Sequence, residues 1–506
     1  MPDSTVNYSF PYPVGGDAVA VHSDVEKLAK AVDAKARSTE NRVDSAFAGI
    51  EEVRFDRSAV PLSSSDNLDV LGNGIRSVWS GTVAAALGLP TETLGKVTTV
   101  RYGTGARTQE WIPRTTTGAQ IWIRNELSGG WSEWTRADAG AGQNGRMLRS
   151  APAGGFKTAP VALTLGYGGA QASGSGTTTV IQHMPGAARR VQLHLRNWNP
   201  RYNMADSAAV DLSQVAIGLH AGGGSTASWS PVPATTGSTG TDGYMSGWVD
   251  VPEAWQGQDV VVRYAWSGST VQRTIGTGWQ GGVRNDTPAL FAWLEVEVPS
   301  STPVIAAFGD SLSSGVSSSR PVVDSWVDQY ARSVGAVPVH WSASGDKASG
   351  WPADAQRKWG MYGWDIAAPD ALVYMMGSND LAEPSITAWE MQARTLATVA
   401  SIRAQITPNV YAGTLLPRTN QAPGSTFETV RRQVNSWLPK AGLFRSVFGF
   451  AAAISDDDEA ILPAFDADGI HLTTAGYAAL AAAIDEPLAG GGADAAIAAY
   501  RAVRGI

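Results

Sequence analysis

The chain has 506 residues, which is too long for one hydrophobic core, so we expect three or more domains. Its 56 Gly and 27 Pro indicate many turns, whereas 43% hydrophobic residues and 19 Trp exclude a largely disordered chain. Only 17% of residues are charged and the net charge is -8, which argues against a nucleic-acid partner and favours a neutral or hydroxyl-rich ligand. The absence of cysteine excludes disulfides and thiolate metal sites.

The first 60 residues predict an attachment segment followed by a helix. No basic region precedes an apolar stretch, and no run approaches about 18 apolar residues, so we expect neither a Sec-type signal nor membrane insertion. A capping-box pair, Ser23 and Glu26, precedes small or apolar residues at steps of three and four on a charged segment, which favours a coiled coil between copies of the chain. A lone amphipathic helix is the alternative. The stripe consists of Val25, Leu28, Val32, Ala36, Thr39, Val43, Ala46, Ile50 and Val53.

Residues 61–138 predict a small β-rich module. Trp and polar residues alternate on both sides of a Gly turn at residues 128–130, which indicates a β-hairpin. Its motifs resemble the knob module of bacteriophage tail fibres and pyocin-like tails, and that resemblance implies a structural or receptor-proximal role. The alternative is that the Trp residues form a core. The motifs are Tyr102-Gly103, residues 108–111 (Thr-Gln-Glu-Trp), Trp122-x-Arg124 and Gly130-Trp131-x-x-Trp134.

A Gly-rich linker at residues 139–156 leads into an all-β region at 157–300. Short apolar runs at residues 177–181, 191–195, 215–219, 260–264 and 290–298 lie between turn clusters, which predicts a β-sandwich or jelly roll. Aromatic and amide side chains gather at residues 197–202, and this combination suits sugars, so Trp198 and Tyr202 are candidate glycan-binding residues. The alternative assigns the Trp residues of this region to the core.

From residue 303 the pattern changes to alternating strands and helices. Strands are expected at residues 304–308, 336–341, 371–376 and 409–415, and helices at 323–334, 387–404 and 426–437, which predicts a parallel sheet with crossover helices. We assign this α/β domain to residues 303–490 and a C-terminal helix to 491–506. Sites in such sheets lie at the carboxyl ends of the strands.

Chemistry-bearing residues follow these strands at regular intervals. Ser311, Gly345 and Asn379 are separated by 34 residues each (345 − 311 and 379 − 345), about one strand-helix repeat. Asp468 lies three residues before His471, a spacing at which a carboxylate can hold one imidazole nitrogen and leave the other for Ser311. The N–H groups of Ser311 and Gly345, with the Asn379 amide, can supply donors for an oxyanion.

These residues resemble the four sequence blocks of SGNH/GDSL hydrolases, in the same order. The blocks here are Gly309-Asp310-Ser311-Leu312, Gly345, residues 377–380 (Gly-Ser-Asn-Asp) and Asp468-x-x-His471. The resemblance implies a three-layer α/β fold with Ser311 as nucleophile, Asp468 and His471 completing the triad, and Ser311, Gly345 and Asn379 forming the oxyanion hole. It implies no metal and no cofactor.

Other residues of the chain suggest competing assignments. His340 lies inside an expected strand, which favours a packed role over catalysis. Asp466 is an alternative orienter of His471 at a less suitable spacing of five. The acidic run at residues 455–459 suggests Ca²⁺, but a solvated loop or helix start is favoured. An inactive descendant with an intact-looking site is a further alternative.

Together the patterns predict a trimeric phage tail or fibre protein whose last domain is a serine esterase. Its expected substrate is a host surface glycan carrying small acyl groups such as acetyl, because no long apolar lid indicates a lipid. Its expected partners are that glycan and other tail proteins, and its expected location is the virion, acting at the host surface. The alternatives are a secreted bacterial esterase and a non-enzymatic receptor-binding adhesin.

Overall fold

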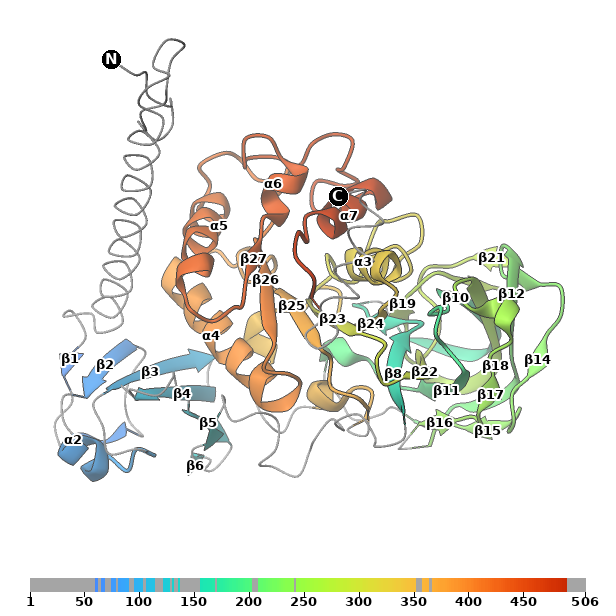
Figure 1. Cartoon of the computed structure of the whole chain (residues 1–506), viewed down its shortest axis with the longest axis horizontal. Coiled ribbons are helices and arrows are strands. Elements are labelled where there is room, and N and C mark those ends of the chain that lie inside the picture. The colour runs from blue at the N-terminus through green and yellow to red at the C-terminus, as the bar shows by residue number, and fades with distance from the viewer. Residues whose placement is uncertain are drawn as a thin grey trace, which may run out of the picture.

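The computed structural model describes residues 155–488, apart from gaps at 169–170, 203–207, 241–242, 352–356 and 364–365, together with parts of residues 60–136. These residues form a small β-rich module, a β-sandwich and an α/β domain, drawn in blue, green and yellow-to-red respectively (Figure 1). The predicted coiled coil within residues 1–60, the linker up to residue 154 and the predicted helix at 491–506 lie outside the described residues.

The β-rich module contains a 7-stranded sheet. Its elements are β1 (Val60–Pro61), β2 (Gly74–Val78), α2 (Gly81–Ala86), β3 (Gly95–Tyr102), β4 (Ala106–Pro113), β5 (Trp122–Leu127), β6 (Gly130–Trp131) and β7 (Thr135–Arg136). The predicted hairpin is confirmed, because β5 pairs antiparallel with β6 across the Gly turn. Trp111 is fully buried with Val97, so its role is to pack the core. The resemblance to a tail knob stays a prediction.

The region predicted to be all-β folds into a sandwich. Its elements are β8 (Phe156–Ala162), β9 (Leu165–Gly166), β10 (Ala172–His183), β11 (Arg190–Arg196), η2 (Pro200–Tyr202), β12 (Asp211–Gly222), β13 (Ser225–Thr226), β14 (Ser230–Pro231), β15 (Gly237–Ser238), β16 (Tyr244–Met245), β17 (Val249–Asp250), η3 (Glu253–Trp255), β18 (Asp259–Val271), β19 (Thr274–Ile275), β20 (Gly278–Gln280), β21 (Val283–Arg284) and β22 (Phe291–Pro299). One sheet has the order β13-β12-β18-β10-β20-β21 and the other β16-β11-β22-β8. Each predicted apolar run lies in a strand, except that Leu290 precedes β22, and the two inner faces share one buried cluster.

The α/β domain has a 5-stranded sheet in which every pairing is parallel. Its elements are β23 (Val304–Gly309), α3 (Trp326–Val334), β24 (Val337–Ser342), η4 (Ala348–Gly350), η5 (Arg357–Gly360), β25 (Ala371–Met375), α4 (Ala388–Gln405), β26 (Val410–Gly413), α5 (Thr426–Trp437), η6 (Leu438–Lys440), β27 (Val447–Phe448), α6 (Phe450–Ile454) and α7 (Thr474–Ala482). The strand order is β24-β23-β25-β26-β27. The predicted strands and helices are confirmed, with ends that differ by a few residues.

Side-chain caps explain where the main helices begin. Ser325, Ser425 and Thr473 each accept a hydrogen bond from a backbone N–H in the first turn of α3, α5 and α7. Thr387 forms a reciprocal capping box with Glu390 at the start of α4. These caps satisfy N–H groups that a helix cannot satisfy by itself, so the short polar residues between strand and helix set the helix starts.

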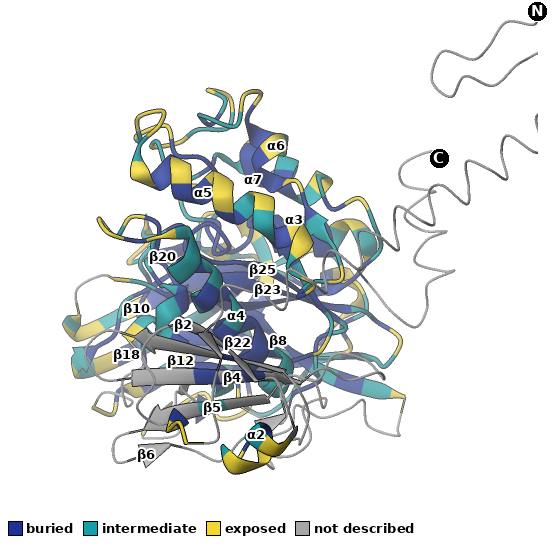
Figure 2. Ribbon diagram, turned by 90° about the vertical axis from the view of Figure 1, so that its left-hand side faces the viewer, coloured by how far each residue is buried: buried dark blue, intermediate teal, exposed yellow. Residues whose placement is uncertain are grey.

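The sheet is covered on both faces. Alternate residues such as Ile305 and Ala307 of β23 share a buried cluster with residues of α3, α6 and α7. The intervening residues, such as Ala306 and Phe308, share a larger cluster with α4, α5 and the sandwich. Figure 2 shows the strands β23 and β25 buried between the layers, while α5 exposes its outer face. Because both faces of the sheet are covered, its strands consist almost entirely of apolar residues, as is usual for a parallel sheet.

The sandwich and the α/β domain share a continuous core. Phe291 and Trp293 of β22 lie against the ring of Tyr362, with centroids 5.7 and 5.6 Å away. Gly166 of β9 forms a parallel bridge with Ala343, just past β24, and the Ser344 N–H donates to the Gly166 carbonyl at 2.8 Å. The sandwich therefore holds the loop that follows β24.

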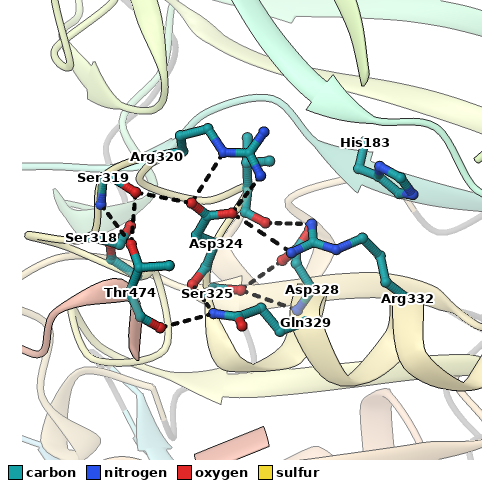
Figure 3. A network of polar contacts seen from close by, with 12 residues as sticks. His183, Ser318, Ser319, Arg320, Asp324, Ser325, Asp328, Gln329, Arg332 and Thr474 are labelled. Atoms are coloured by element: carbon teal, nitrogen blue, oxygen red, sulfur yellow. Dashed lines mark hydrogen bonds and ion pairs between the residues drawn. The ribbon is translucent and has the colours of Figure 1, made fainter. Parts of the chain in front are cut away.

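A polar network joins the same two domains at a second place (Figure 3). Arg320 donates to Asp259 of β18 and, at 2.7 Å, to Asp324 ahead of α3. A hydrogen bond from His183, with ion pairing to Arg320, lowers the pKa of Asp259 to about 2. The Ser319 N–H donates to Oγ1 of Thr474 at the start of α7. The network thus connects the sandwich to the segments that follow Ser311 and His471.

In the described part of the chain, no helix combines the length and the apolar character needed to cross a membrane.

Candidate active site

The sheet order brings three of the predicted site residues together. β23 lies between β24 and β25, and its last residue, Gly309, is opposite Ser342 on one side and Met375 on the other. Ser311, Gly345 and Asn379 follow these three positions by two, three and four residues. Because parallel strands end at one edge, the loop with the serine is flanked by the loops carrying the other two residues.

Ser311 and His471 are directly hydrogen-bonded although 160 residues separate them. The distance from Ser311 Oγ to His471 Nε2 is 2.9 Å, and His471 Nδ1 lies 2.8 Å from Asp468 Oδ2. Ser311 is 6% exposed, so its hydroxyl lies at the surface of a tightly packed edge and not in a free loop. This is the geometry of a nucleophile, a base and an orienting carboxylate.

The loop before α7 positions the carboxylate. Asp468 Oδ1 accepts the backbone N–H groups of Ile470 and His471 at 3.1 and 2.8 Å, and Oδ2 also accepts from Ser317 at 3.1 Å. Partial burial opposes ionisation, but the His471 backbone N–H and imidazole outweigh it and lower the pKa of Asp468 to about 2. Asp466 does not contact His471 through its side chain; it accepts the Gly469 N–H at 2.6 Å and shapes the turn.

The oxyanion donors predicted from the sequence lie beside the serine. Among the described residues, the backbone N–H groups of Ser311 and Gly345 have no protein acceptor. The side-chain amide of Asn379 donates to the Asp346 carbonyl at 2.9 Å and makes a longer contact of 3.4 Å with Asp310. Two unsatisfied N–H groups and an oriented amide can stabilise negative charge on a substrate oxygen.

Sequence reasoning assigned no role to two buried charged residues that support this site. Arg418, after β26, donates to the carbonyl and hydroxyl of Ser378 at 2.9 and 2.8 Å and contacts the Asn379 amide oxygen at 3.4 Å. Asp310 accepts the Leu312 N–H at 3.0 Å, and burial raises its pKa to about 7. The sequence signal for Arg418 is an arginine in the loop five residues after the apolar strand β26.

The competing assignments have structural roles. His340 is completely buried, with Nε2 2.5 Å from Asp328 Oδ2 of α3, so it joins β24 to α3 and makes no hydrogen bond to the three triad residues. In the acidic run, Asp458 and Glu459 pair with Arg431 and Arg432. Within the described residues, no group of three or more His, Asp or Glu side chains is arranged to hold a metal ion.

The two candidate glycan-binding residues are in opposite environments. Trp198 is 0% exposed and packs edge-on against Phe291, so the prediction that it stacks on a sugar is wrong and the core alternative holds. An indole with no free face cannot contact a ligand. Tyr202, four residues later, is 48% exposed and lines a hollow beside Gly345. It therefore remains a candidate.

The parallel sheet, the Ser-His-Asp arrangement and the flanking N–H donors define a serine hydrolase domain of the acyl-transfer class. Residues 307–479 match the family model of the GDSL-like Lipase/Acylhydrolase family. The C-terminal part of the chain is thus a GDSL-type hydrolase domain, and this supports esterase activity. No curated protein matched the chain.

Several solved structures are similar to this chain. A putative lipolytic protein of the G-D-S-L family from Desulfitobacterium hafniense is 17% identical, covers 36% of this chain and 97% of its own, and has a TM-score of 0.29. A catalytic mutant of an acetylxylan esterase from Geobacillus stearothermophilus is 16% identical over 37% and 97%, with a TM-score of 0.29. A family two carbohydrate esterase from Clostridium thermocellum in complex with cellohexaose is 12% identical over 62% and 92%, with a TM-score of 0.31.

Proposed function

We propose that this protein is a serine esterase that removes small acyl groups, acetyl above all, from a glycan. The observation that carries the proposal is the hydrogen-bonded series from Ser311 through His471 to Asp468, with spans of 2.9 and 2.8 Å. A hydroxyl in contact with an imidazole that is itself held by a carboxylate can be deprotonated as it attacks a carbonyl.

The proposed reaction has two halves. Ser311 Oγ attacks the ester carbonyl as His471 Nε2 takes its proton, and the resulting oxyanion accepts from Ser311, Gly345 and Asn379. The C–O bond to the glycan then breaks, and His471 returns the proton to the departing glycan oxygen. In the second half, His471 takes a proton from water, the water oxygen attacks the acyl-serine, and the carboxylic acid leaves as Ser311 regains its proton.

The surface around the site supports a polar substrate. Among the described residues, the large exposed hydrophobic side chains are Tyr202, Leu219, Met245 and Val283, and all of them belong to the sandwich. The described residues of the α/β domain therefore include no large, mostly exposed apolar side chain on which a fatty chain could lie. The hollow beside Gly345 is lined by polar and charged residues such as Asp346 and Lys347. Short acyl groups on a hydroxyl-rich polymer fit this surface better than a lipid.

The setting of this activity is a second part of the proposal. We propose a homotrimeric phage tail or fibre protein that contacts other tail proteins, brings the esterase to the host cell surface and acts there on surface glycan. The sequence stripe at residues 25–53 and the knob-like motifs at 102–134 support this setting. Sedimentation of the full-length protein as a monomer would contradict the trimer and would favour a secreted esterase.

The esterase proposal is tested by acetate release from candidate cell-envelope polysaccharides. Wild type should release acetate and Ser311→Ala should not. Ser313→Ala is the matched control, because Ser313 is a fully buried serine two residues away whose Oγ has no hydrogen-bond partner among the residues that the structure describes. Activity that survives in Ser311→Ala would contradict the assignment of Ser311 as the nucleophile. No release from any ester by the wild type would contradict the esterase proposal and would favour a non-enzymatic adhesin.

A further inference from the structure

A hollow of about 440 Å³ lies where the sandwich meets the α/β domain. The α/β domain contributes Gly345, Asp346, Lys347 and Lys358, and the sandwich contributes Arg201 and Tyr202. Gly345 is also one of the oxyanion donors described above, so the hollow adjoins the reaction centre. A substrate bound at Ser311 would therefore pass close to residues of the sandwich.

The loop that carries Arg201 is held firmly against the catalytic domain. Asn199, which is 3% exposed, accepts the Arg201 N–H at 3.1 Å and donates to the Tyr167 carbonyl at 2.6 Å. A Cβ on Gly166 would lie 2.8 Å from both the Arg201 backbone nitrogen and Ala343 Cβ. Only glycine permits this approach, so Arg201 is placed beside the loop that follows β24 by backbone packing.

The guanidinium of Arg201 lies on Gly345 itself. A Cβ built on Gly345 would be 2.6 Å from Cζ and Nη1 and 2.8 Å from Nη2 of Arg201. Gly345 also has φ of +76°, a conformation that residues with a side chain rarely adopt. The glycine therefore serves two purposes: it turns the chain at the oxyanion loop, and it leaves room for a cation from the other domain.

The structure shows no counter-ion for Arg201 among the residues that it describes. Among the described residues, no carboxylate forms an ion pair with Arg201, and its guanidinium donates no hydrogen bond. By contrast, the Asp346 carboxylate accepts from Lys358 Nζ at 2.9 and 2.8 Å, and Lys347 pairs with Glu383 at 2.8 Å. A guanidinium with no counter-ion among the described residues, at the edge of an open hollow, is suited to bind an anionic group with two parallel hydrogen bonds.

Tyr202 adds an apolar face next to that cation. Its side chain is 48% exposed, and its ring centroid lies 5.4 Å from Arg201 Cζ. An aromatic ring beside a guanidinium cation is complementary to a sugar that has an apolar ring face and an acidic substituent.

We propose that Arg201 and Tyr202 form a subsite for an acidic sugar of the substrate glycan, with Arg201 pairing to a carboxylate or phosphate and Tyr202 stacking on the ring. The inference rests on the proposed function and deepens it, because it names an acidic glycan as the substrate. The sandwich thereby contributes substrate-binding residues to the active site of the neighbouring domain.

The test uses the full chain with Arg201→Gln, Arg201→Lys and a control, Arg189→Gln. Arg189 is an exposed arginine of the same domain that does not line the hollow. The substrates are an O-acetylated uronate polysaccharide, the same polymer after carboxyl reduction, and an O-acetylated polymer with phosphodiesters. Loss of a charge-assisted contact predicts about a 10- to 100-fold fall in kcat/KM on the charged polymer that the protein uses, mainly through KM.

For Arg201→Gln, kcat/KM should fall at least about tenfold more on the preferred charged polymer than on the carboxyl-reduced polymer, because only a charged group can pair with Arg201. Arg201→Lys should retain part of the preference, and Arg189→Gln should match wild type. Whichever charged polymer shows the Arg201-dependent loss identifies carboxylate or phosphate as the ligand group. Equal falls on charged and neutral polymers, or no fall, would overturn the proposal.

A binding measurement separates this inference from the esterase proposal. Titration calorimetry compares Ser311→Ala with the double variant Ser311→Ala, Arg201→Gln, using a uronate oligosaccharide and a phosphodiester-containing oligosaccharide as probes. Weaker binding of either probe by the double variant supports the subsite even if no ester is hydrolysed. If the two variants bind each probe equally, or if Ser311→Ala binds neither probe, the subsite proposal is overturned whether or not the enzyme is active. Melting temperatures of both variants show that the fold is retained.

Discussion

The orienting role of Asp468 can be tested by replacing it with asparagine. Asn can still accept backbone N–H groups through its amide oxygen, so the loop before α7 should keep its shape. What changes is the partner of His471 Nδ1, now 2.8 Å from a carboxylate oxygen. The amide cannot stabilise the imidazolium that forms when Ser311 is deprotonated, and it permits the wrong tautomer.

The size of the effect follows from the exposure of Asp468. Where such a carboxylate is buried, the Asp→Asn change lowers kcat by about 10⁴-fold. The Asp468 side chain is 44% exposed here, so water also stabilises the imidazolium and the carboxylate contributes less than a buried one would. We expect a loss of about 10²- to 10³-fold in kcat, equivalent to about 3–4 kcal/mol of transition-state stabilisation.

The assay is initial-rate hydrolysis of a soluble acetyl ester by wild type, Asp468→Asn and Asp466→Asn. Asp466→Asn makes the same charge change two residues away, where the carboxylate accepts only the Gly469 N–H and does not contact His471. The comparison is best made at a pH of about 8, where Asp468, with a pKa of about 2, is fully ionised and an imidazole is ordinarily neutral. Equal losses in the two variants, or full activity in Asp468→Asn, would refute the orienting role.

Three further outcomes are expected. Asn379→Ala should lower kcat by about 10²- to 10³-fold with little change in KM, because its amide acts on the oxyanion, and a change confined to KM would contradict this. Trp198→Ala should lower the free energy of unfolding in denaturant titration by about 3–5 kcal/mol, since a fully buried indole leaves a cavity, whereas a loss below about 1 kcal/mol would indicate a surface role. Burial raises the pKa of Asp310 to about 7, so relative to Asp310→Asn the wild type should lose stability as pH rises from about 4 through 7; a difference in melting temperature that does not vary with pH would exclude this.

Local patterns were enough to predict much of the catalytic domain. Apolar runs such as residues 371–376 alternate with helical stretches opened by capping residues such as Thr387, and both properties are set within a few residues of chain. Because alternating strands and helices imply a parallel sheet, the residues that follow successive strands must lie at the same edge of that sheet. Ser311, Gly345 and Asn379 could therefore be grouped before any contact between them was known.

Sequence patterns could not predict burial where it depends on which part of the fold packs against a residue. Trp198 and Tyr202 lie in one aromatic loop and both suit sugar binding by composition. The fold buries the first against Phe291 and exposes the second at the hollow. A four-residue spacing in an irregular loop has no fixed periodicity, so sequence alone could not separate them.

By itself, then, the sequence determined the strand-helix alternation, the hairpin at residues 122–131 and the set of residues that meet at the edge of the parallel sheet, because these depend on period and spacing along the chain. Only the tertiary structure decided that Arg201 lies on Gly345, 144 residues away, and that Arg418 supports Asn379. Those contacts arise from docking one domain or strand end against another, and a close approach of backbones, as at Gly166, leaves no periodic signal in the sequence.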